Sequence, residues 1–263
     1  MNSGMVDVVI PNYERKEKLL RAVQSVLIQG EAISQIIIVD DGSSPEVLEF
    51  INKNVSTLPK VKFTLIPHTG NPGIVRNIAI NQSNSKYLAF LDSDDFWFPG
   101  KIDLQIAKFK IRDIVLVCSN ARVYKNGEII GKYFNKKSTQ LRKFDILVHN
   151  SIINSSVLVK SDVIKAVGGF AESDSVIGIE DHVTWTKLVN EGDFYFMQEC
   201  LLGYTRSASS ISLRISEEQR LAGRKIIYGG LNYTNRLILG LNQILVYGKK
   251  VLYYLFLKIR VKL

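Results

Sequence analysis

Hydrophobic and polar positions divide the first 95 residues into short alternating blocks. Apolar runs typical of strands occupy residues 6–10, 36–39, 61–66 and 87–91. Between them, apolar side chains recur at helical spacing near residues 19–27, 45–52 and 74–79. This β-α-β-α-β-α-β order predicts a parallel sheet with right-handed crossovers.

The second half of the chain has a different pattern. It predicts separate meander or hairpin strands at residues 114–118, 121–124 and 128–134, with an Asn126-Gly127 turn between the last two. Further strands are expected at 157–160 and 193–198, and helices at 161–167 and 180–190. Because no internal repeat or low-complexity linker interrupts the chain, we expect one mixed α/β domain, with a mostly parallel central sheet covered by helices on both faces.

Charge is concentrated at the end of the chain. No acidic residue follows Glu218, whereas nine basic residues do, and nine is also the net charge of the whole protein. The remainder is therefore neutral, which argues against a general nucleic-acid binder. Cys118 and Cys200 are isolated, as expected for free thiols in a reducing compartment. The first residues do not resemble a signal peptide, so we expect a cytoplasmic protein.

The basic segment 237–263 is rich in apolar and aromatic residues but is interrupted by polar ones. It contains no run of the ~18 apolar residues that a membrane-spanning helix requires. We expect residues 216–263 to form a helical extension that touches the cytoplasmic face of the membrane. The alternative is a packing or homodimerisation element.

Three carboxylates follow the strand at 87–91, namely Asp92, Asp94 and Asp95. Ligands of open α/β sheets bind beyond the carboxyl ends of strands. Acids so close together repel one another unless a cation lies between them, and a divalent metal ion with a bound phosphate meets this need. The alternative is an acidic turn that caps the next helix.

Other strand ends also carry polar or aromatic side chains. Pro11 and Tyr13 offer a face for a nucleobase, although a tyrosine here could simply pack. Asp40 and Asp41 could accept hydrogen bonds from a base or sugar, or cap a helix. Arg76, near a helix start, suits a phosphate or a base carbonyl, or is an ordinary surface arginine.

A second acidic cluster, Glu180-Asp181, lies far away in the sequence. A carboxylate there could deprotonate an acceptor hydroxyl if it faces Asp94 across a cleft. The adjacent His182 has no partner at metal-ligand spacing, so we expect it to be structural.

Taken together, these motifs resemble a known enzyme family. Val-Val-Ile-Pro-Asn-Tyr, Ile-Ile-Ile-Val-Asp-Asp-Gly-Ser, Gly-Ile-Val-Arg-Asn, Phe-Leu-Asp-Ser-Asp-Asp, Gly-Gly-Phe and Glu-Asp occur in this order between residues 5 and 212. The set resembles the inverting family 2 glycosyltransferases of bacterial polysaccharide and O-antigen synthesis, which have the A-type nucleotide-diphospho-sugar transferase fold. It implies a catalytic domain at 1–215, with a nucleotide-binding half at 1–95 and an acceptor-binding half at 96–215.

The resemblance also implies roles for individual residues. Asp94 would bind Mn²⁺ or Mg²⁺ at the donor diphosphate, and Asp181 would be the general base that deprotonates the acceptor hydroxyl. The implied nucleotide-sugar-binding residues are Pro11, Tyr13, Glu14, Asp40, Asp41, Arg76, Asp92, Ser93 and Asp94. The implied acceptor-binding residues are Glu180, Phe170 and Trp185. The last two, and also Trp97, could stack on a sugar or else pack in the core.

Two departures from the family pattern refine the expected function. The chain has Tyr204-Thr205-Arg206-Ser207 where relatives often carry Tyr-Arg-x-His, and it lacks the Gln-x-x-Arg-Trp signature of processive synthases. Without the missing histidine, Arg206 could still supply charge at this position, and the absence of the processive signature implies transfer of one sugar per encounter. The family resemblance implies a UDP-hexose donor, and together with the basic apolar tail it implies a glycan or lipid-diphosphate-linked acceptor. A catalytically silent nucleotide-sugar-binding module is the main alternative. A nucleotidyltransferase and a Rossmann dehydrogenase are disfavoured because no Gly-rich phosphate loop is present.

Overall fold

A computed structural model describes residues 4–111, 113–148, 150–206 and 215–229 of the 263. Its strands are β1 Val6–Asn12, β2 Ile33–Asp40, β3 Val61–Leu65, β4 Tyr87–Phe90, β5 Phe96–Trp97, β6 Ile114–Lys125, β7 Glu128–Lys132, β8 Thr139–Leu141, β9 Leu158–Lys160 and β10 Asp193–Thr205. Its α-helices are α1 Glu17–Leu27, α2 Pro45–Asn54, α3 Pro72–Asn81, α4 Lys101–Ile106, α5 Lys143–Val148, α6 Ser161–Ala166, α7 Glu180–Leu188 and α8 Glu217–Gly229.

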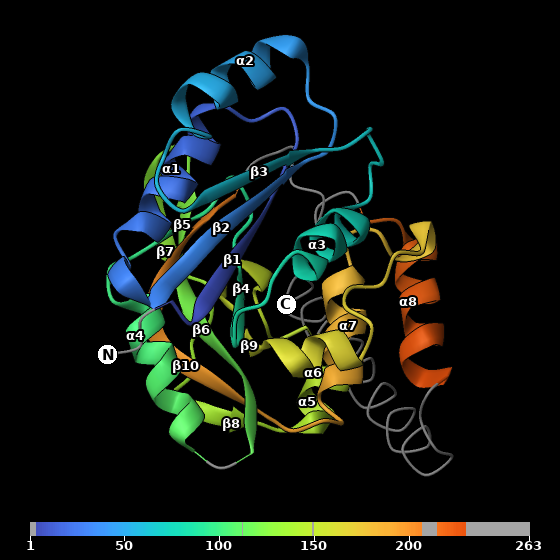
Figure 1. Ribbon diagram of the computed structural model, residues 1–263. Coiled ribbons are helices and arrows are strands. Elements are labelled where there is room, and N and C mark those ends of the chain that lie inside the picture. The colour runs from blue at the N-terminus through green and yellow to red at the C-terminus, as the bar shows by residue number, and fades with distance from the viewer. Residues whose placement is uncertain (1–3, 112, 149, 207–214, 230–263) are drawn as a thin grey trace, which may run out of the picture. The chain divides into compact units, whose positions relative to one another are not determined.

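The strands form one curled, mixed sheet at the centre of the fold (Figure 1). Its main path runs β3-β2-β1-β4-β9-β6-β10-β5, while β7 pairs with β6 and β8 with β10. The strands of the first half pair in parallel, as predicted. Because β9 is antiparallel to both β4 and β6, it joins this parallel half to the second half of the sheet.

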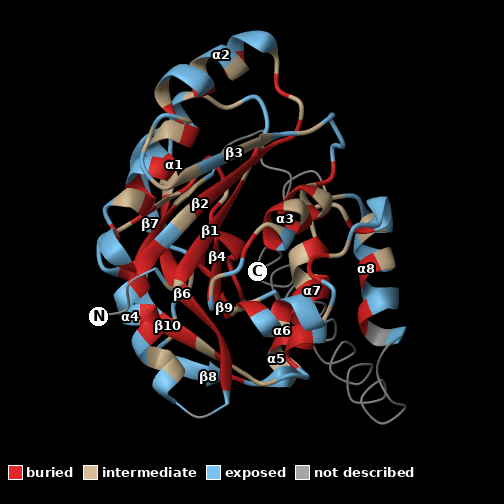
Figure 2. Ribbon diagram, in the orientation of Figure 1, coloured by how far each residue is buried: buried red, intermediate tan, exposed pale blue. Residues whose placement is uncertain are grey.

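Most residues of the central strands are buried (Figure 2). Because side chains alternate along a strand, the core is divided into two layers, one on each face of the sheet. Val8 and Ile38 point to the layer that holds α1 and α2. Val9 and Ile37 point to the opposite layer, which contains side chains of α3, α6 and α7. The predicted α/β architecture with helices on both faces is therefore confirmed.

Two strands of the second half are longer than the sequence pattern predicts. Residues 114–118 and 121–124 belong to the single strand β6, because pairing with β10 continues through Ser119 and Asn120. The Asn120 side chain also bonds to the backbone of Phe134. Strand β10 continues past Gln198 to Thr205 through a break in its pairing register. The short elements α4, α5, β5 and β8 had no clear sequence signal. The Asn126-Gly127 hairpin turn is confirmed, with both residues at positive φ.

A side-chain amide on α3 joins the two halves of the fold. Asn77 donates to the carbonyl of Phe170 at 2.9 Å and accepts from its backbone N–H at 2.8 Å. Gly169 has a φ of +69°, and a Cβ built there would lie 2.3 Å from Oδ1 of Asn77. The Gly-Gly-Phe motif therefore ends α6 and lets the chain approach α3 closely.

Helix α8 begins at a reciprocal cap. The Ser216 N–H donates to Oε1 of Gln219 at 2.9 Å, and the Gln219 N–H donates to Oγ of Ser216 at 3.1 Å. The chain divides into two units, residues 1–223 and 224–263. Most of the predicted extension at 216–263, including the apolar segment 237–263, lies outside the described residues. Among the described helices, none is long and apolar enough to cross a membrane.

Replacing Asn77 with alanine should destabilise the fold. It removes three hydrogen bonds to the segment 170–172, including one to Glu172 at 2.7 Å, and leaves buried backbone groups unpaired. We expect the free energy of unfolding to fall by about 2–3 kcal/mol in denaturant titrations. Asn81→Ala, at an exposed position on the same helix, is the matched control. Equal effects of the two changes would contradict the proposed junction.

Candidate functional site

The carboxyl ends of β1, β2 and β4 lie together at one edge of the sheet. Asn12 pairs in register with Asp40, and Val9 pairs with Phe90, two residues before Asp92. The predicted nucleotide-binding residues of the first half therefore gather at this edge, as expected for adjacent parallel strands.

Asp40 is completely buried and organises two loops. Its Oδ2 accepts from the Asn12 side chain at 2.7 Å and from the Ser43 hydroxyl at 2.9 Å, while Oδ1 accepts from the Ser43 N–H at 2.8 Å. Glu14 reinforces the arrangement, since its carboxylate accepts from the Ser44 N–H at 2.6 Å and from the Ser44 hydroxyl at 3.0 Å. Both acids therefore support the loops after β1 and β2.

Asp41 holds the loop that precedes α3. One carboxylate oxygen accepts from the N–H and hydroxyl of Thr69, and the other accepts from the Gly70 N–H at 2.9 Å. His68 lies 3.2 Å from the same carboxylate and stacks on the half-exposed ring of Tyr13, with ring centroids 4.3 Å apart. Tyr13 thus offers an aromatic surface beside Asp41, next to the partly buried Pro11.

Arg76 links the two acidic clusters. Its guanidinium contacts Oδ1 of Asp92 at 2.8 Å and Oε1 of Glu180 at 2.7 Å. The arginine and Glu180 are both buried, and the Phe170 ring lies under the guanidinium at 5.2 Å. Burial opposes the ionisation of Asp92, but the nearby arginine outweighs it and lowers the pKa of this carboxyl.

Asp94 and Asp95 are held by different partners. Arg15 lies 3.0 Å from Oδ1 of Asp94 and donates to the Ser93 hydroxyl at 3.2 Å. Oδ1 of Asp95 accepts from the backbone N–H of Thr205 at 2.8 Å. Burial raises the pKa of both acids, and the charges of Asp94 and Asp92 add to the effect on Asp95. The acidic loop after β4 is therefore compact and rich in negative charge.

Asp181 lies in the first turn of α7, directly after the Glu180 that Arg76 binds. It is partly buried, and its Oδ2 accepts from the Asn150 side chain at 3.1 Å. Burial and the neighbouring charge of Glu180 raise the pKa of Asp181 to about 7. Such a carboxylate is poised to accept a proton near neutral pH. His182 instead contacts the carbonyl of Ile146, in agreement with a structural role.

Phe170 and Trp185 are core residues, so their interpretation as sugar-stacking residues is wrong. Their exposed fractions are 2% and 0%, and their rings meet edge to face at 5.6 Å. Because their faces are covered, stacking on an acceptor sugar is not available to them. Trp97, at 1% exposed, is buried in the same way.

Two further residues touch the predicted site without having been singled out from the sequence. Arg15 contacts Asp94, but in the sequence it is one of two adjacent basic residues before α1. Asn154 donates to Oδ1 of Asp92 at 3.4 Å, and its own Oδ1 is buried without a hydrogen-bond partner in the described part of the chain. It precedes Ser155, whose hydroxyl accepts from the Asp92 N–H at 3.1 Å. Asn154 and Ser155 come shortly before β9, and the antiparallel pairing of β9 with β4 brings their side chains close to Asp92.

Comparison with known proteins identifies the family. The model for "Glycosyl transferase family 2" matches residues 7–162. The chain therefore belongs to this family, and the assignment made from its motifs is confirmed.

Several relatives carry more specific names. The chain is 28% identical over 137 residues to Escherichia coli WfgD, "UDP-Glc:alpha-D-GlcNAc-diphosphoundecaprenol beta-1,3-glucosyltransferase", covering 51% of this chain and 52% of WfgD. It is 24% identical to the Bacillus subtilis "putative teichuronic acid biosynthesis glycosyltransferase TuaG", covering 79% of this chain and 81% of TuaG. An uncharacterized glycosyltransferase of Rickettsia bellii is 25% identical, with 89% of this chain covering 32% of that protein. The chain thus spans only part of some relatives.

A solved structure has the same fold. S. aureus TarS 1–349 in complex with UDP superposes with a TM-score of 0.70 at 18% identity, covering 88% of this chain and 68% of TarS 1–349. This match confirms the A-type glycosyltransferase fold.

Removing the charge of Arg76 should destabilise the protein strongly. Arg76→Gln leaves Glu180 and Asp92 without their cation, and we expect a loss of about 3 kcal/mol in the free energy of unfolding. Adding Glu180→Gln should recover part of this loss, because it removes one unpaired acid. Arg142→Gln, which breaks an exposed ion pair with Asp145, should change little. If Arg76→Gln behaves like Arg142→Gln in denaturant titrations, the bridge does not hold the site together.

Proposed function

We propose that the protein is a non-processive, inverting glycosyltransferase that moves one sugar from a UDP-hexose to a hydroxyl of a lipid-diphosphate-linked glycan. The observation that supports this most is the Arg76 bridge. It connects Asp92, at the predicted nucleotide side, to Glu180, whose neighbour Asp181 is the candidate base.

The proposed reaction is a single displacement. Asp181 accepts the proton of the acceptor hydroxyl as its oxygen attacks the anomeric carbon of the donor sugar. The bond from that carbon to the nucleoside diphosphate breaks on the opposite face, so an α-linked donor gives a β-linked product. The partly buried position of Asp181 supports this role, because it keeps the carboxylate basic enough to take a proton at neutral pH.

Nucleotide binding is assigned to the edge formed by β1, β2 and β4. The exposed Tyr13 ring would stack on the base beside Asp41, while Asp40 and Glu14 keep the loops in place. Asp92 and Ser93 would lie near the ribose and diphosphate. Solved TarS structures with UDP and with UDP-GlcNAc share this fold and support a uridine nucleotide as the donor.

The residues at Asp94 fit a divalent metal that binds together with the donor. Asp94 supplies hard carboxylate oxygen, and Arg15 contacts its Oδ1. No group of three or more His, Cys, Asp or Glu side chains within the described ranges forms a metal site by itself. Mg²⁺ is commonly held by one or two carboxylates plus substrate phosphates, which matches this arrangement. When bound, Mn²⁺ or Mg²⁺ would offset charge on the departing diphosphate.

The acceptor class rests on the relatives. WfgD and WfaP are named for transfer of glucose to GlcNAc-diphosphoundecaprenol, and TuaG for teichuronic acid synthesis. We therefore place the protein in bacterial surface polysaccharide synthesis, acting at the cytoplasmic face of the membrane where such an acceptor would be anchored.

The assay that tests this function measures UDP release with and without acceptor. Wild-type protein should release UDP from a UDP-hexose only when a lipid-diphosphate monosaccharide and Mn²⁺ are present. Asp181→Asn should bind the donor with unchanged affinity but lose about 10²–10⁴-fold in transfer rate, because it cannot take the proton. Asp162→Asn, an exposed acid on α6, is the control. A catalytically silent nucleotide-sugar-binding module would bind the donor without releasing UDP. Full turnover by Asp181→Asn would show that Asp181 is not the general base.

The pH dependence of the reaction provides an independent test. A carboxylate acting as base must be ionised, and the pKa of Asp181 is raised to about 7. Below this value, kcat/KM should therefore fall about tenfold per pH unit, whereas above it the rate should level off. The residual activity of Asp181→Asn should not show this decrease of kcat/KM at low pH. A wild-type profile that stays flat down to pH 5 would contradict the assignment.

A further inference from the structure

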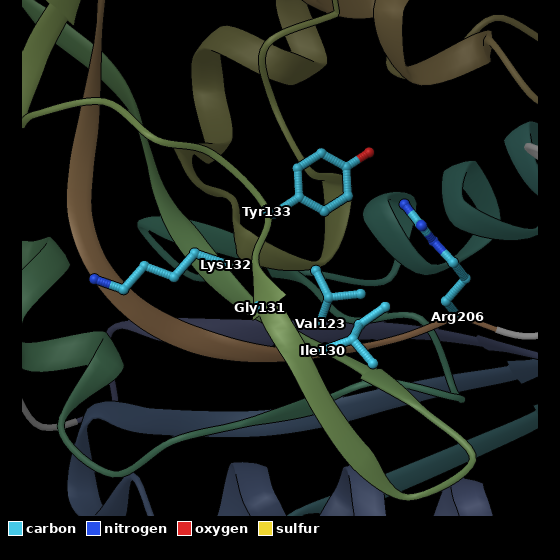
Figure 3. Close-up of a pocket in the computed structure, with 6 residues that line it drawn as sticks. All are labelled: Val123, Ile130, Gly131, Lys132, Tyr133 and Arg206. Carbon is cyan, nitrogen blue, oxygen red and sulfur yellow. The ribbon is translucent and has the colours of Figure 1, made fainter.

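A small pocket lies against the β6–β7 hairpin, and none of its lining residues comes from the loops after β1, β2 and β4 that we assign to the donor nucleotide. It has a volume of about 200 Å³ and is lined by Val123, Ile130, Gly131, Lys132, Tyr133 and Arg206. In Figure 3, the side chains of Val123 and Ile130 lie together, with Tyr133 and Arg206 extending beyond them. Lys132 extends away from both, so Arg206 supplies the positive charge of this pocket.

The backbone fixes Arg206 beside the acidic loop. Its N–H donates to the carbonyl of Tyr124 at 2.8 Å, and the preceding Thr205 donates to Asp95 at 2.8 Å. Arg21 adds a second connection, because its Nη2 contacts both the Asp94 carbonyl, at 2.6 Å, and the Thr205 hydroxyl, at 3.2 Å. The pocket is therefore anchored to the loop that carries Asp94.

Arg206 is exposed, and within residues 4–206 no described acid lies at ion-pairing distance from it. Tyr133 provides a second donor. Burial raises the pKa of its hydroxyl, which therefore stays protonated, and the charges of Arg206, Asp181 and Asp95 all act on it. The tyrosine thus lies within electrostatic range of both acidic clusters.

Part of the pocket lining is aliphatic. Val123 is buried beneath the pocket, and the neighbouring side chain of Ile130 on β7 is 52% exposed. An arginine and a phenol beside an aliphatic surface suit an anion joined to a hydrocarbon. The donor diphosphate does not have this character, because it continues into a ribose and a base.

We propose that Arg206 and Tyr133 bind the diphosphate of the acceptor, with the start of its lipid chain lying on Ile130 and its sugar extending towards Asp181. This inference rests on the proposed function, since it concerns the acceptor of the same reaction. It makes Arg206 a determinant of acceptor class, selecting sugars that carry a lipid diphosphate over neutral glycosides.

Binding tests the pocket without requiring turnover. A synthetic monosaccharide-diphosphate-lipid is titrated into wild-type protein, Arg206→Gln, Tyr133→Phe and Arg122→Gln. Arg122 is an exposed arginine next to Val123 on the same hairpin, and it contacts Phe98 instead of lining the pocket. A charge-assisted hydrogen bond is worth about 10- to 100-fold in affinity. We expect a loss of this size for Arg206→Gln, a smaller loss for Tyr133→Phe and none for Arg122→Gln.

Kinetics then distinguish the acceptor from the donor. The same monosaccharide is supplied as the diphosphate-lipid or as an octyl glycoside without phosphates. Arg206→Gln should lower kcat/KM only for the diphosphate-lipid and leave the KM of the UDP-hexose unchanged. An equal loss with both acceptors and a raised donor KM would place Arg206 on the donor and overturn the proposal, as would unchanged binding and kinetics.

The proposed function can fail separately from this inference. If wild-type protein transfers no sugar to either acceptor but binds the diphosphate-lipid through Arg206, the pocket assignment stands and the proposed reaction is wrong. If transfer occurs and Arg206→Gln binds like wild type, the reaction stands and the pocket assignment is wrong.

Discussion

The site depends on a buried guanidinium shared by two carboxylates from opposite halves of the chain. Arg76 is 16 residues from Asp92 and 104 residues from Glu180, yet it contacts both within 2.8 Å. A buried cation is costly unless paired, so α3 can pack in this position only when the loop after β4 and the start of α7 are both in place. Packing of the two halves and assembly of the candidate site therefore depend on the same contacts.

Most of the remaining acids are used to hold the backbone. Asp40, Asp41 and Glu14 accept hydrogen bonds from neighbouring loops, so contacts within the chain hold the loops at this edge of the sheet in place. By contrast, Asp181 combines partial burial with an adjacent like charge, and it keeps a raised pKa. The structure thus separates carboxylates that build the frame from one suited to proton transfer.

Sequence patterns were sufficient to predict those parts of the structure that depend on interactions between residues close together in the chain. The parallel first half follows from apolar runs that end in turn-forming residues, and Asp92 and Asp181 are recognisable within short motifs. Contacts made by distant parts of the chain were not predictable. Arg15 and Asn154 lack any local signal, and β9 must return antiparallel before Asn154 can reach Asp92. For Trp185, an aromatic residue beside an acidic motif suggests sugar stacking, but only the packing of α7 shows that it is buried.

The central claim is that the acids after β4 and the acid at the start of α7 face one another across a single bound donor. A crystal structure of the Asp181→Asn protein with a UDP-hexose and Mn²⁺ tests it most directly, using the anomalous signal of the metal. We expect manganese beside Asp94 and the anomeric carbon exposed towards residue 181, on the face opposite the diphosphate. A donor sugar that points away from residue 181, or that offers it only the face of the leaving group, would contradict the account.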